Sequence, residues 1–207
     1  MLRLLLTVFC LMPMALLADA QDSAHKVSDF VLADQHGTIH RLYEHKDKAA
    51  VVIMIQGNGC PIVRNALGEF RALRDTYTGK DVEFFMLNAN LQDQADAILR
   101  EARTYGIDLP VLHDKTQQVG ESLNLIRTAE VLIINPANWS IAYRGPINDR
   151  QGYERQKPQA THHYAAEAID RVVAGLPVAE PKRETLGCLI HFPKRQFAPN
   201  APSLSGA

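Results

Sequence analysis

The sequence places one cysteine where a helix is expected to begin. Cys60 lies in the stretch 56–64, which reads QGNGCPIVR and follows a continuous apolar run. Pro61 suits the first turn of a helix, because its missing N–H would have no partner there. A thiol at a helix N-terminus lies close to unpaired N–H groups and to the positive end of the helix dipole, and both favour the thiolate. Cys60 is therefore the candidate nucleophile, and Arg64, one turn along, would add to the positive field.

The neighbours of Cys60 bear on whether its thiol is reactive. The alternative is a buried, inert cysteine, because free cysteines are common in protein cores. Gly57, Asn58 and Gly59 instead predict an accessible loop between a strand and a helix. The sequence therefore favours a reactive Cys60.

The first twenty residues have the features of a secretory signal peptide. Arg3 supplies a positive charge, the run from Leu4 to Leu17 is almost wholly apolar, and Ala18-Asp19-Ala20 fits the small-residue cleavage pattern. The apolar run is too short for a stable membrane span. We therefore expect residues 1–20 to be a signal peptide, no integral membrane span, and a mature protein that is periplasmic or secreted.

Export would change the meaning of the cysteines. The sequence has three cysteines, and cleavage of the signal peptide would remove Cys10. Cys60 and Cys188 would remain, in a compartment where disulfides form and persist. They are either a structural disulfide or a redox pair in which Cys188 is the resolving thiol. A third interpretation is a tail thiol at Cys188 that never meets Cys60.

The rest of the chain predicts alternating strands and helices. Buried strands appear as apolar, β-branched runs, and helices as apolar residues at helical spacing. The expected strands are 29–32, 39–42, 49–55, 82–87, 131–134 and 141–144, and the expected helices are 61–77, 95–105, 117–123 and 164–174. The first two strands form a hairpin around a polar turn, and the last two strands form another.

This order of elements predicts an α/β protein with a mixed sheet, because a hairpin is antiparallel whereas a βαβ crossover is parallel. It fits a thioredoxin-like sandwich with a mixed central sheet, an N-terminal hairpin and an extended C-terminal tail. The apolar fraction of 46% and the length of 207 residues suit one ordinary domain. We expect this domain over residues 27–178 and a tail over 179–207 that carries Cys188.

Three short motifs give the chain a resemblance to a known family. Gly59-Cys60-Pro61 follows the expected central strand, Tyr143-Arg144-Gly145 ends a later strand, and Leu186-Gly187-Cys188-Leu189-Ile190 lies in the tail. With these motifs the chain resembles the redoxin branch of the thioredoxin superfamily, and most closely its peroxiredoxin-like group. The resemblance implies redox chemistry at Cys60, with Arg144 and Asp149 lining the site. An exposed salt bridge is the alternative for these two residues.

The sequence departs from the family at three positions. Peroxiredoxins have Thr or Ser three residues before the reactive cysteine, where this chain has Gly57. Dithiol thioredoxins have a second cysteine where this chain has Val63. Ala129 stands where the superfamily has a cis-proline, and a cis bond without proline costs about 3 kcal/mol. The usual substrate-docking edge is therefore expected to differ.

Composition and histidine placement restrict the ligands and partners. The formal net charge is −1 and comes from intermixed acids and bases, so we expect no nucleic acid partner. The histidines are mostly scattered through polar segments, and we expect no metal and no cofactor. A Cu(I) site formed by Cys60, Cys188 and His191 is the alternative. However, Arg64 stands where the second cysteine of a CxxxC copper pair would lie.

These observations predict an exported thiol-disulfide oxidoreductase. Cys60 would attack a disulfide in a protein or small molecule, or a peroxide, and Cys188 would resolve the intermediate. A thioredoxin-type protein would then be the reductant. The alternatives are a peroxide-reducing enzyme, a non-catalytic copper-binding protein and a redox-inactive fold used for protein contacts.

Overall fold

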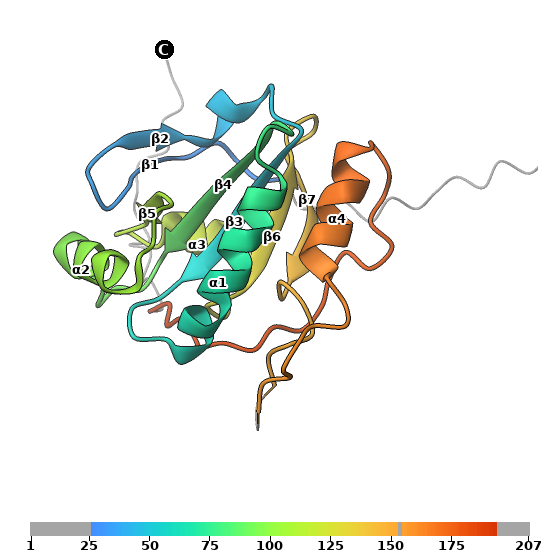
Figure 1. Ribbon diagram of the computed structural model, residues 1–207. Coiled ribbons are helices and arrows are strands. Elements are labelled where there is room, and N and C mark those ends of the chain that lie inside the picture. The colour runs from blue at the N-terminus through green and yellow to red at the C-terminus, as the bar shows by residue number, and fades with distance from the viewer. Residues whose placement is uncertain (1–25, 153–154, 194–207) are drawn as a thin grey trace, which may run out of the picture.

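The structure is a computed structural model that describes residues 26–152 and 155–193 (Figure 1). The expected signal peptide and the end of the expected tail, residues 194–207, lie outside the described residues. Among the residues that the structure describes, no helix is long and apolar enough to cross a membrane.

A five-stranded sheet forms the centre of the protein, in the order β5-β4-β3-β6-β7. Its strands are β3 (Ala50–Gln56), β4 (Val82–Asn88), β5 (Val111–His113), β6 (Val131–Asn135) and β7 (Ser140–Gly145). β3 pairs in parallel with β4 and antiparallel with β6, and β6 pairs antiparallel with β7. The predicted mixed sheet is therefore confirmed. Every residue of β3 is buried, because this central strand is covered on both faces.

Helices cover the two faces of the sheet (Figure 1). The helices are α1 (Pro61–Thr76), α2 (Ala95–Tyr105), α3 (Gln118–Ser122) and α4 (Tyr164–Val173). Val52 and Met54 of β3 face one apolar cluster, which includes α1, α4 and Ile98 of α2. Val51 and Ile53 face a second cluster, which includes α3 and the N-terminal hairpin. This alternation along β3 follows from the two-residue period of a strand.

The N-terminal hairpin is shorter than predicted. It consists of β1 (Val31–Ala33) and β2 (Ile39–Arg41), which pair antiparallel in a separate two-stranded sheet. The predicted second strand ends early, because Leu42 begins a 3-10 helix, η1 (Leu42–His45). The carboxylate of Asp34 holds the turn by accepting the N–H groups of His36 and Thr38.

The expected helix boundaries agree closely with the structure. α1 begins at Pro61 as predicted, and α2 ends at Tyr105, directly before Gly106, which adopts the left-handed conformation that favours glycine. α3 is one residue shorter than expected at each end, and α4 ends one residue early. Such differences arise at helix ends because the last turn has few hydrogen bonds.

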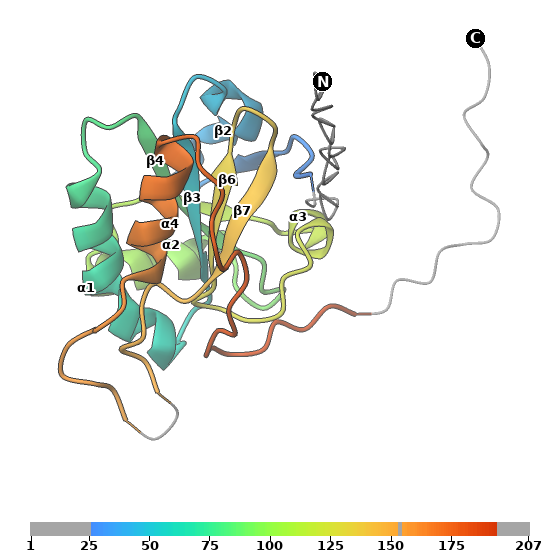
Figure 2. The ribbon, with the colours of Figure 1, turned by 90° about the vertical axis from the view of Figure 1, so that its right-hand side faces the viewer.

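The segment that follows α4 returns across the domain. It runs beside β7 and then along the lower end of the sheet (Figure 2). The Arg144 N–H donates to the Pro181 carbonyl at 2.8 Å, and the Arg183 N–H donates to the Arg144 carbonyl at 2.9 Å. Further on, Leu189 forms an antiparallel bridge with Arg127. Residues 186–192 are called the C-terminal arm below.

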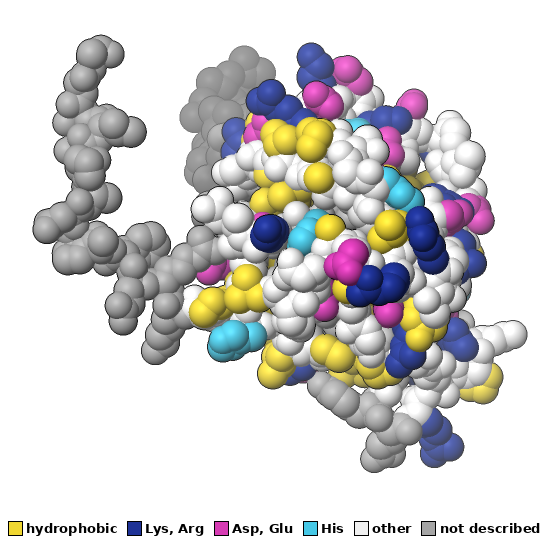
Figure 3. Space-filling view, turned by 90° about the vertical axis from the view of Figure 1, so that its left-hand side faces the viewer, with side chains coloured by type: hydrophobic (Ala, Val, Ile, Leu, Met, Phe, Trp, Pro, Cys, Tyr) yellow, Lys and Arg dark blue, Asp and Glu magenta, His cyan; other side chains and the backbone are white. Residues whose placement is uncertain are grey.

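The surface carries charges of both signs. On the face in Figure 3, Lys and Arg side chains alternate with Asp and Glu side chains, and apolar side chains lie between them. This mixing agrees with the formal net charge of −1. The face shown has no extended basic surface of the kind that binds nucleic acid.

Candidate active site

The loop between β3 and α1 presents Cys60 at the N-terminus of the helix. Gly59 has a φ of 73°, a conformation that glycine adopts without steric cost. The chain then turns, so that the Cys60 N–H donates to the Gly57 carbonyl at 3.2 Å. Cys60 is the N-cap residue, and its carbonyl accepts the Arg64 N–H at 3.1 Å in the first helical hydrogen bond. The predicted placement of Cys60 at the start of the helix is therefore what the structure has.

The C-terminal arm brings Cys188 to Cys60. The two Sγ atoms lie 3.0 Å apart, although 128 residues separate the cysteines in the chain. Both cysteines are free thiols in this structure. A disulfide has an S–S bond of about 2.05 Å, so a small movement of either side chain would allow the bond to form.

The structure corrects the expectation that Cys60 is accessible. Its side chain is only 3% exposed, although its loop is built from small and polar residues. Cys188 Sγ of the arm and the Thr128 hydroxyl both lie against the thiol and contribute to this burial. Cys188 itself is exposed.

Backbone hydrogen bonds hold the arm beside the loop that precedes β6. The Thr128 N–H donates to the Cys188 carbonyl at 2.9 Å, and the Ile190 N–H donates to the Ile126 carbonyl at 2.9 Å. Gly187 is required at the closest approach, because a Cβ atom there would lie 1.9 Å from the Thr128 carbonyl oxygen. Any larger residue directly before Cys188 would therefore prevent the arm from docking in this position.

Thr128 contributes a hydroxyl that the sequence analysis did not identify. Its Oγ1 atom lies 3.1 Å from Cys60 Sγ and accepts the Cys188 N–H at 2.9 Å. The Thr128 methyl group occupies the space beside Gly57, where a Cβ atom would lie 2.7 Å from Thr128 Cγ2. Thr128 therefore brings a hydroxyl beside Cys60, and its methyl group fills the place that a side chain at Gly57 would take. The signal available in the sequence was its position directly before Ala129.

Ala129 takes the place of the cis-proline without a cis bond. None of the described peptide bonds is cis, and Ala129 instead has a φ of 63°. This left-handed conformation is uncommon for residues other than glycine. Two hydrogen bonds hold it, from the Ala129 N–H to the Ile55 carbonyl at 2.7 Å and from the Ile55 N–H to the Glu130 carbonyl at 2.8 Å. The edge just before it, at residues 126–128, is occupied by the arm.

The two thiols differ in acidity. Burial raises the pKa of Cys60, but hydrogen bonds from the Cys188 thiol, the Thr128 hydroxyl and the Val63 N–H outweigh burial and lower this pKa overall. Burial raises the pKa of Cys188, and the hydrogen bond to Cys60 and the charge of the Cys60 thiolate raise it further. Cys60 is therefore the thiol that loses its proton first.

A buried polar network connects the Cys60 loop to the ends of β3 and β4. One carboxylate oxygen of Asp93 accepts the Asn58 N–H at 2.9 Å and the side-chain amides of Asn88 at 2.9 Å and Asn90 at 3.0 Å. Asn88 also donates to Gln56 at 2.6 Å, at the end of β3. Because Asp93 bonds to Asn58 of the loop and Asn88 bonds to Gln56 at the end of β3, the network fixes the position from which Cys60 is presented.

Two predicted site residues make contacts outside the thiol pair. Arg64 is exposed, and its guanidinium donates to the Tyr105 hydroxyl at 2.8 Å. Arg144 pairs with Glu130 at 2.7 Å. Among the described residues, no hydrogen bond or ion pair joins either guanidinium to a cysteine. Arg144 therefore supports the site through Glu130 and through its backbone bonds to the returning segment.

Asp149 organises the loop that follows β7. Its carboxylate accepts hydrogen bonds from Lys157, Thr161 and the His162 N–H. These bonds lower the pKa of Asp149 well below its ordinary value. The residue also lines a cavity next to the active site, which agrees with the implied position, although its carboxylate is committed to the loop.

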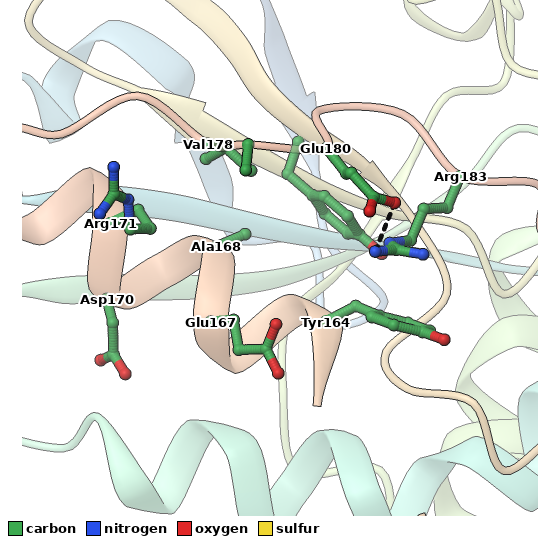
Figure 4. Close-up of a pocket in the computed structure, with 10 residues that line it drawn as sticks. Tyr164, Glu167, Ala168, Asp170, Arg171, Val178, Glu180 and Arg183 are labelled. Atoms are coloured by element: carbon green, nitrogen blue, oxygen red, sulfur yellow. Dashed lines mark ion pairs between the residues drawn. The ribbon is translucent and has the colours of Figure 1, made fainter. Parts of the chain in front are cut away.

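Two cavities lie near the returning segment. A cavity of about 230 Å³ adjoins the thiols, because its lining includes Ile62 from α1, Ala129 and Leu186 of the arm. A larger cavity of about 570 Å³ lies between α4 and residues 178–183 (Figure 4). Arg183 lies over the Tyr164 ring in the larger cavity, at 3.9 Å from the ring centre. Neither cysteine lines either cavity, but only the smaller one is lined by Ala129, the residue after Thr128, and by a residue of the arm.

The copper alternative requires His191 beside the two thiols. Within residues 26–152 and 155–193, no group of three His, Cys, Asp or Glu side chains is placed to hold a metal ion. His191 uses its carbonyl to accept the side-chain amide of Gln117 at 2.9 Å.

Several solved structures of bacterial proteins are similar to this structure. A hypothetical protein from Sinorhizobium meliloti has a TM-score of 0.72 and 23% identity, covering 81% of this chain and 92% of that protein. An uncharacterized conserved protein from Geobacillus kaustophilus has a TM-score of 0.72 and 27% identity, covering 86% and 93%. A peroxidoxin, BcpB, from Mycobacterium tuberculosis has a TM-score of 0.54 and 17% identity, covering 73% and 96%. These matches show a thioredoxin-like fold.

The sequence also matches a family model. The AhpC/TSA family model matches residues 24–150, which include Cys60, Thr128 and Arg144 but not the C-terminal arm. No curated protein matches the sequence. The redoxin family match and the fold together support a thioredoxin-fold redox protein.

Proposed function

The chain belongs to the AhpC/TSA family, and we propose that it is a thiol-disulfide oxidoreductase with Cys60 as nucleophile and Cys188 as resolving thiol. The observation that carries this proposal is the 3.0 Å separation of the two Sγ atoms, one at a helix N-terminus and one on the docked arm. Two thiols at this separation support intramolecular resolution without a second cysteine at Val63.

The proposed reaction with a disulfide has two exchange steps. The Cys60 thiolate attacks one sulfur of the substrate, forming a mixed disulfide and releasing the other sulfur as a thiolate. The Cys188 thiol then loses its proton and attacks Cys60 Sγ, which forms the Cys60–Cys188 bond and releases the second substrate thiolate. A dithiol reductant, which is itself oxidised to a disulfide, returns the pair to two thiols.

Peroxide reduction is the second candidate, and the burial of Cys60 favours it. A side chain that is 3% exposed is reached more easily by a small peroxide than by a protein disulfide. The Cys60 thiolate would attack one peroxide oxygen, giving a sulfenic acid and releasing the alcohol or water. Cys188 would then attack the sulfenic sulfur, forming the disulfide and releasing water. The Thr128 hydroxyl lies where it can hydrogen-bond the reacting groups.

Both candidates are tested by activity measurements on reduced protein. Reduction of insulin disulfides and consumption of hydrogen peroxide are measured for the wild type, Cys60→Ser and Cys188→Ser. Cys60→Ser is expected to abolish turnover, and Cys188→Ser to leave one turnover that stops at a mixed disulfide or a sulfenic acid. Wild-type activity retained in Cys60→Ser would contradict the proposal. The substrate that wild type turns over separates the two candidates.

The proposal includes export, which rests on the sequence of residues 1–20 alone. In an oxidising compartment the pair would need a reductant delivered there. The mass of the protein isolated from the exported fraction tests this point, because cleavage before Gln21 predicts a chain without Cys10. An intact N-terminus in that fraction would contradict it.

A further inference from the structure

The Thr128 hydroxyl lies between the two cysteines and contacts both. Its oxygen accepts the Cys188 N–H at 2.9 Å and lies 3.1 Å from Cys60 Sγ. A hydroxyl has a single proton to donate, and a thiolate can only accept. Because the oxygen already accepts from the Cys188 backbone, its own proton is free to point at the Cys60 thiolate.

The space around Thr128 is made by two glycines. Gly57 lacks the Cβ atom that would lie 2.7 Å from Thr128 Cγ2, and Gly187 lacks the one that would lie 1.9 Å from the Thr128 carbonyl oxygen. The Thr128 N–H also donates to the Cys188 carbonyl at 2.9 Å. The side chain is thus held from the nucleophile loop on one side and from the arm on the other.

We propose that Thr128 is a catalytic residue whose hydroxyl is directed at Cys60 by the docked C-terminal arm, so that docking makes Cys60 a competent nucleophile. The inference rests on the proposed function of Cys60. According to this proposal the arm has two functions: it carries the resolving thiol, and it supplies the backbone N–H that orients Thr128. Undocking would make Cys60 more accessible but would remove this orientation.

The other charged groups near the Cys60 loop lie on α1, on α2, on the segment before α2 and beside β6, and none of them is changed in the experiment below. Each is already held by a partner of its own, so none is expected to reorganise when the arm changes. Arg64 donates to the Tyr105 hydroxyl, and Arg144 forms an ion pair with Glu130. Glu101 accepts the Gly59 N–H, and Asp93 accepts the Asn58 N–H. The Cys188 thiol, which also titrates, is removed in every variant compared.

The first comparison is between Cys188→Ala and Cys188→Pro in the full chain. Both variants lack the second thiol, but only proline also lacks the N–H that Thr128 accepts. The pH dependence of iodoacetamide alkylation is measured at the Cys60 peptide by mass spectrometry. We expect the midpoint to lie about one pH unit higher in Cys188→Pro, which is the size of effect that loss of a hydrogen bond to a charged group produces. Equal midpoints would overturn the proposal.

The second comparison adds Thr128→Val to each of these variants. Valine keeps the shape of threonine and removes its hydroxyl, so the midpoint is expected to rise by about one pH unit in the Cys188→Ala background. It should rise little further in the Cys188→Pro background, because the oriented hydroxyl is already lost. Full additivity of the two changes would show that the arm and Thr128 act independently and would overturn the proposal.

Thr128→Ser and circular dichroism control for structure. Serine restores a hydroxyl without the methyl group, and in the Cys188→Ala background it should return the midpoint close to that of threonine. A serine variant that titrates like the valine variant would contradict a role for the hydroxyl. Alkylation needs no substrate, so these outcomes are independent of whether insulin or peroxide is turned over. Loss of turnover with the expected midpoints would overturn the proposed function and leave the role of Thr128 intact.

Discussion

Cys60 and Cys188 differ in exposure and in acidity, and the two differences oppose each other. Cys60 has the lowered pKa but is 3% exposed, whereas Cys188 is exposed and has the raised pKa. A substrate must therefore be small enough to pass the arm, or the arm must move before Cys60 reacts. Hydrogen-bond donors cause the acidity of Cys60, because burial alone would favour the neutral thiol.

At the residue scale we predict that the two thiols of reduced protein titrate in a fixed order. The pKa of Cys60 is lowered, so its alkylation should reach half its maximal rate at a pH below the ordinary pKa of a cysteine. Alkylation of Cys188, whose pKa is raised, should do so at a pH above that value. The rate at each peptide is followed from pH 5 to 10 by mass spectrometry. A Cys188 midpoint at or below that of Cys60 would show that the roles of nucleophile and resolving thiol are reversed.

The elements of the sheet could be predicted because their sequences are distinctive. The buried run of β3 and the apolar spacing of α1 identify a strand and a helix, and Pro61 marks the boundary between them. The contact between Thr128 and the arm could not be predicted in the same way. It depends on a bridge between Arg127 and Leu189, which are far apart in the sequence and carry no periodic pattern. The contact of Cys188 with the buried Cys60 thiol is also long-range, because 128 residues separate the two cysteines.

At the element scale the arm is expected to dock only because Gly187 has no side chain. In Gly187→Ala, the Cβ atom would lie 1.9 Å from the Thr128 carbonyl oxygen. Either the arm leaves its place or the fold loses about 1–3 kcal/mol through overpacking. Formation of the Cys60–Cys188 disulfide after addition of diamide should therefore slow at least tenfold, as measured by loss of free thiols in quenched samples.

Gly68→Ala provides the matched control for this prediction. Gly68 lies inside α1, and a Cβ atom there would have no neighbour within 4 Å. Alanine should keep the rate of disulfide formation and raise helix stability by roughly 0.5–1 kcal/mol. If Gly187→Ala formed the disulfide as fast as Gly68→Ala, docking of the arm would not control the reaction.

At the scale of the whole molecule, the two cysteines come from different parts of the chain. The sheet and α1 fix Cys60, while Cys188 comes from a segment outside the part that the AhpC/TSA family model matches. The thiols are already 3.0 Å apart in the reduced protein. Oxidation and reduction should therefore leave the fold intact, which distinguishes a catalytic pair from a disulfide that holds the domain together.

The central claim is that Cys60 and Cys188 form a reversible intramolecular bond, and non-reducing peptide mapping tests it most directly. Reduced protein is oxidised with one equivalent of diamide or hydrogen peroxide, digested at low pH and analysed by mass spectrometry. The account predicts a linked pair of peptides that contain Cys60 and Cys188. The link should disappear on mild treatment with dithiothreitol while the circular dichroism spectrum is unchanged. A free Cys188 in fully oxidised protein, or a bond that is reduced only when the domain unfolds, would contradict it.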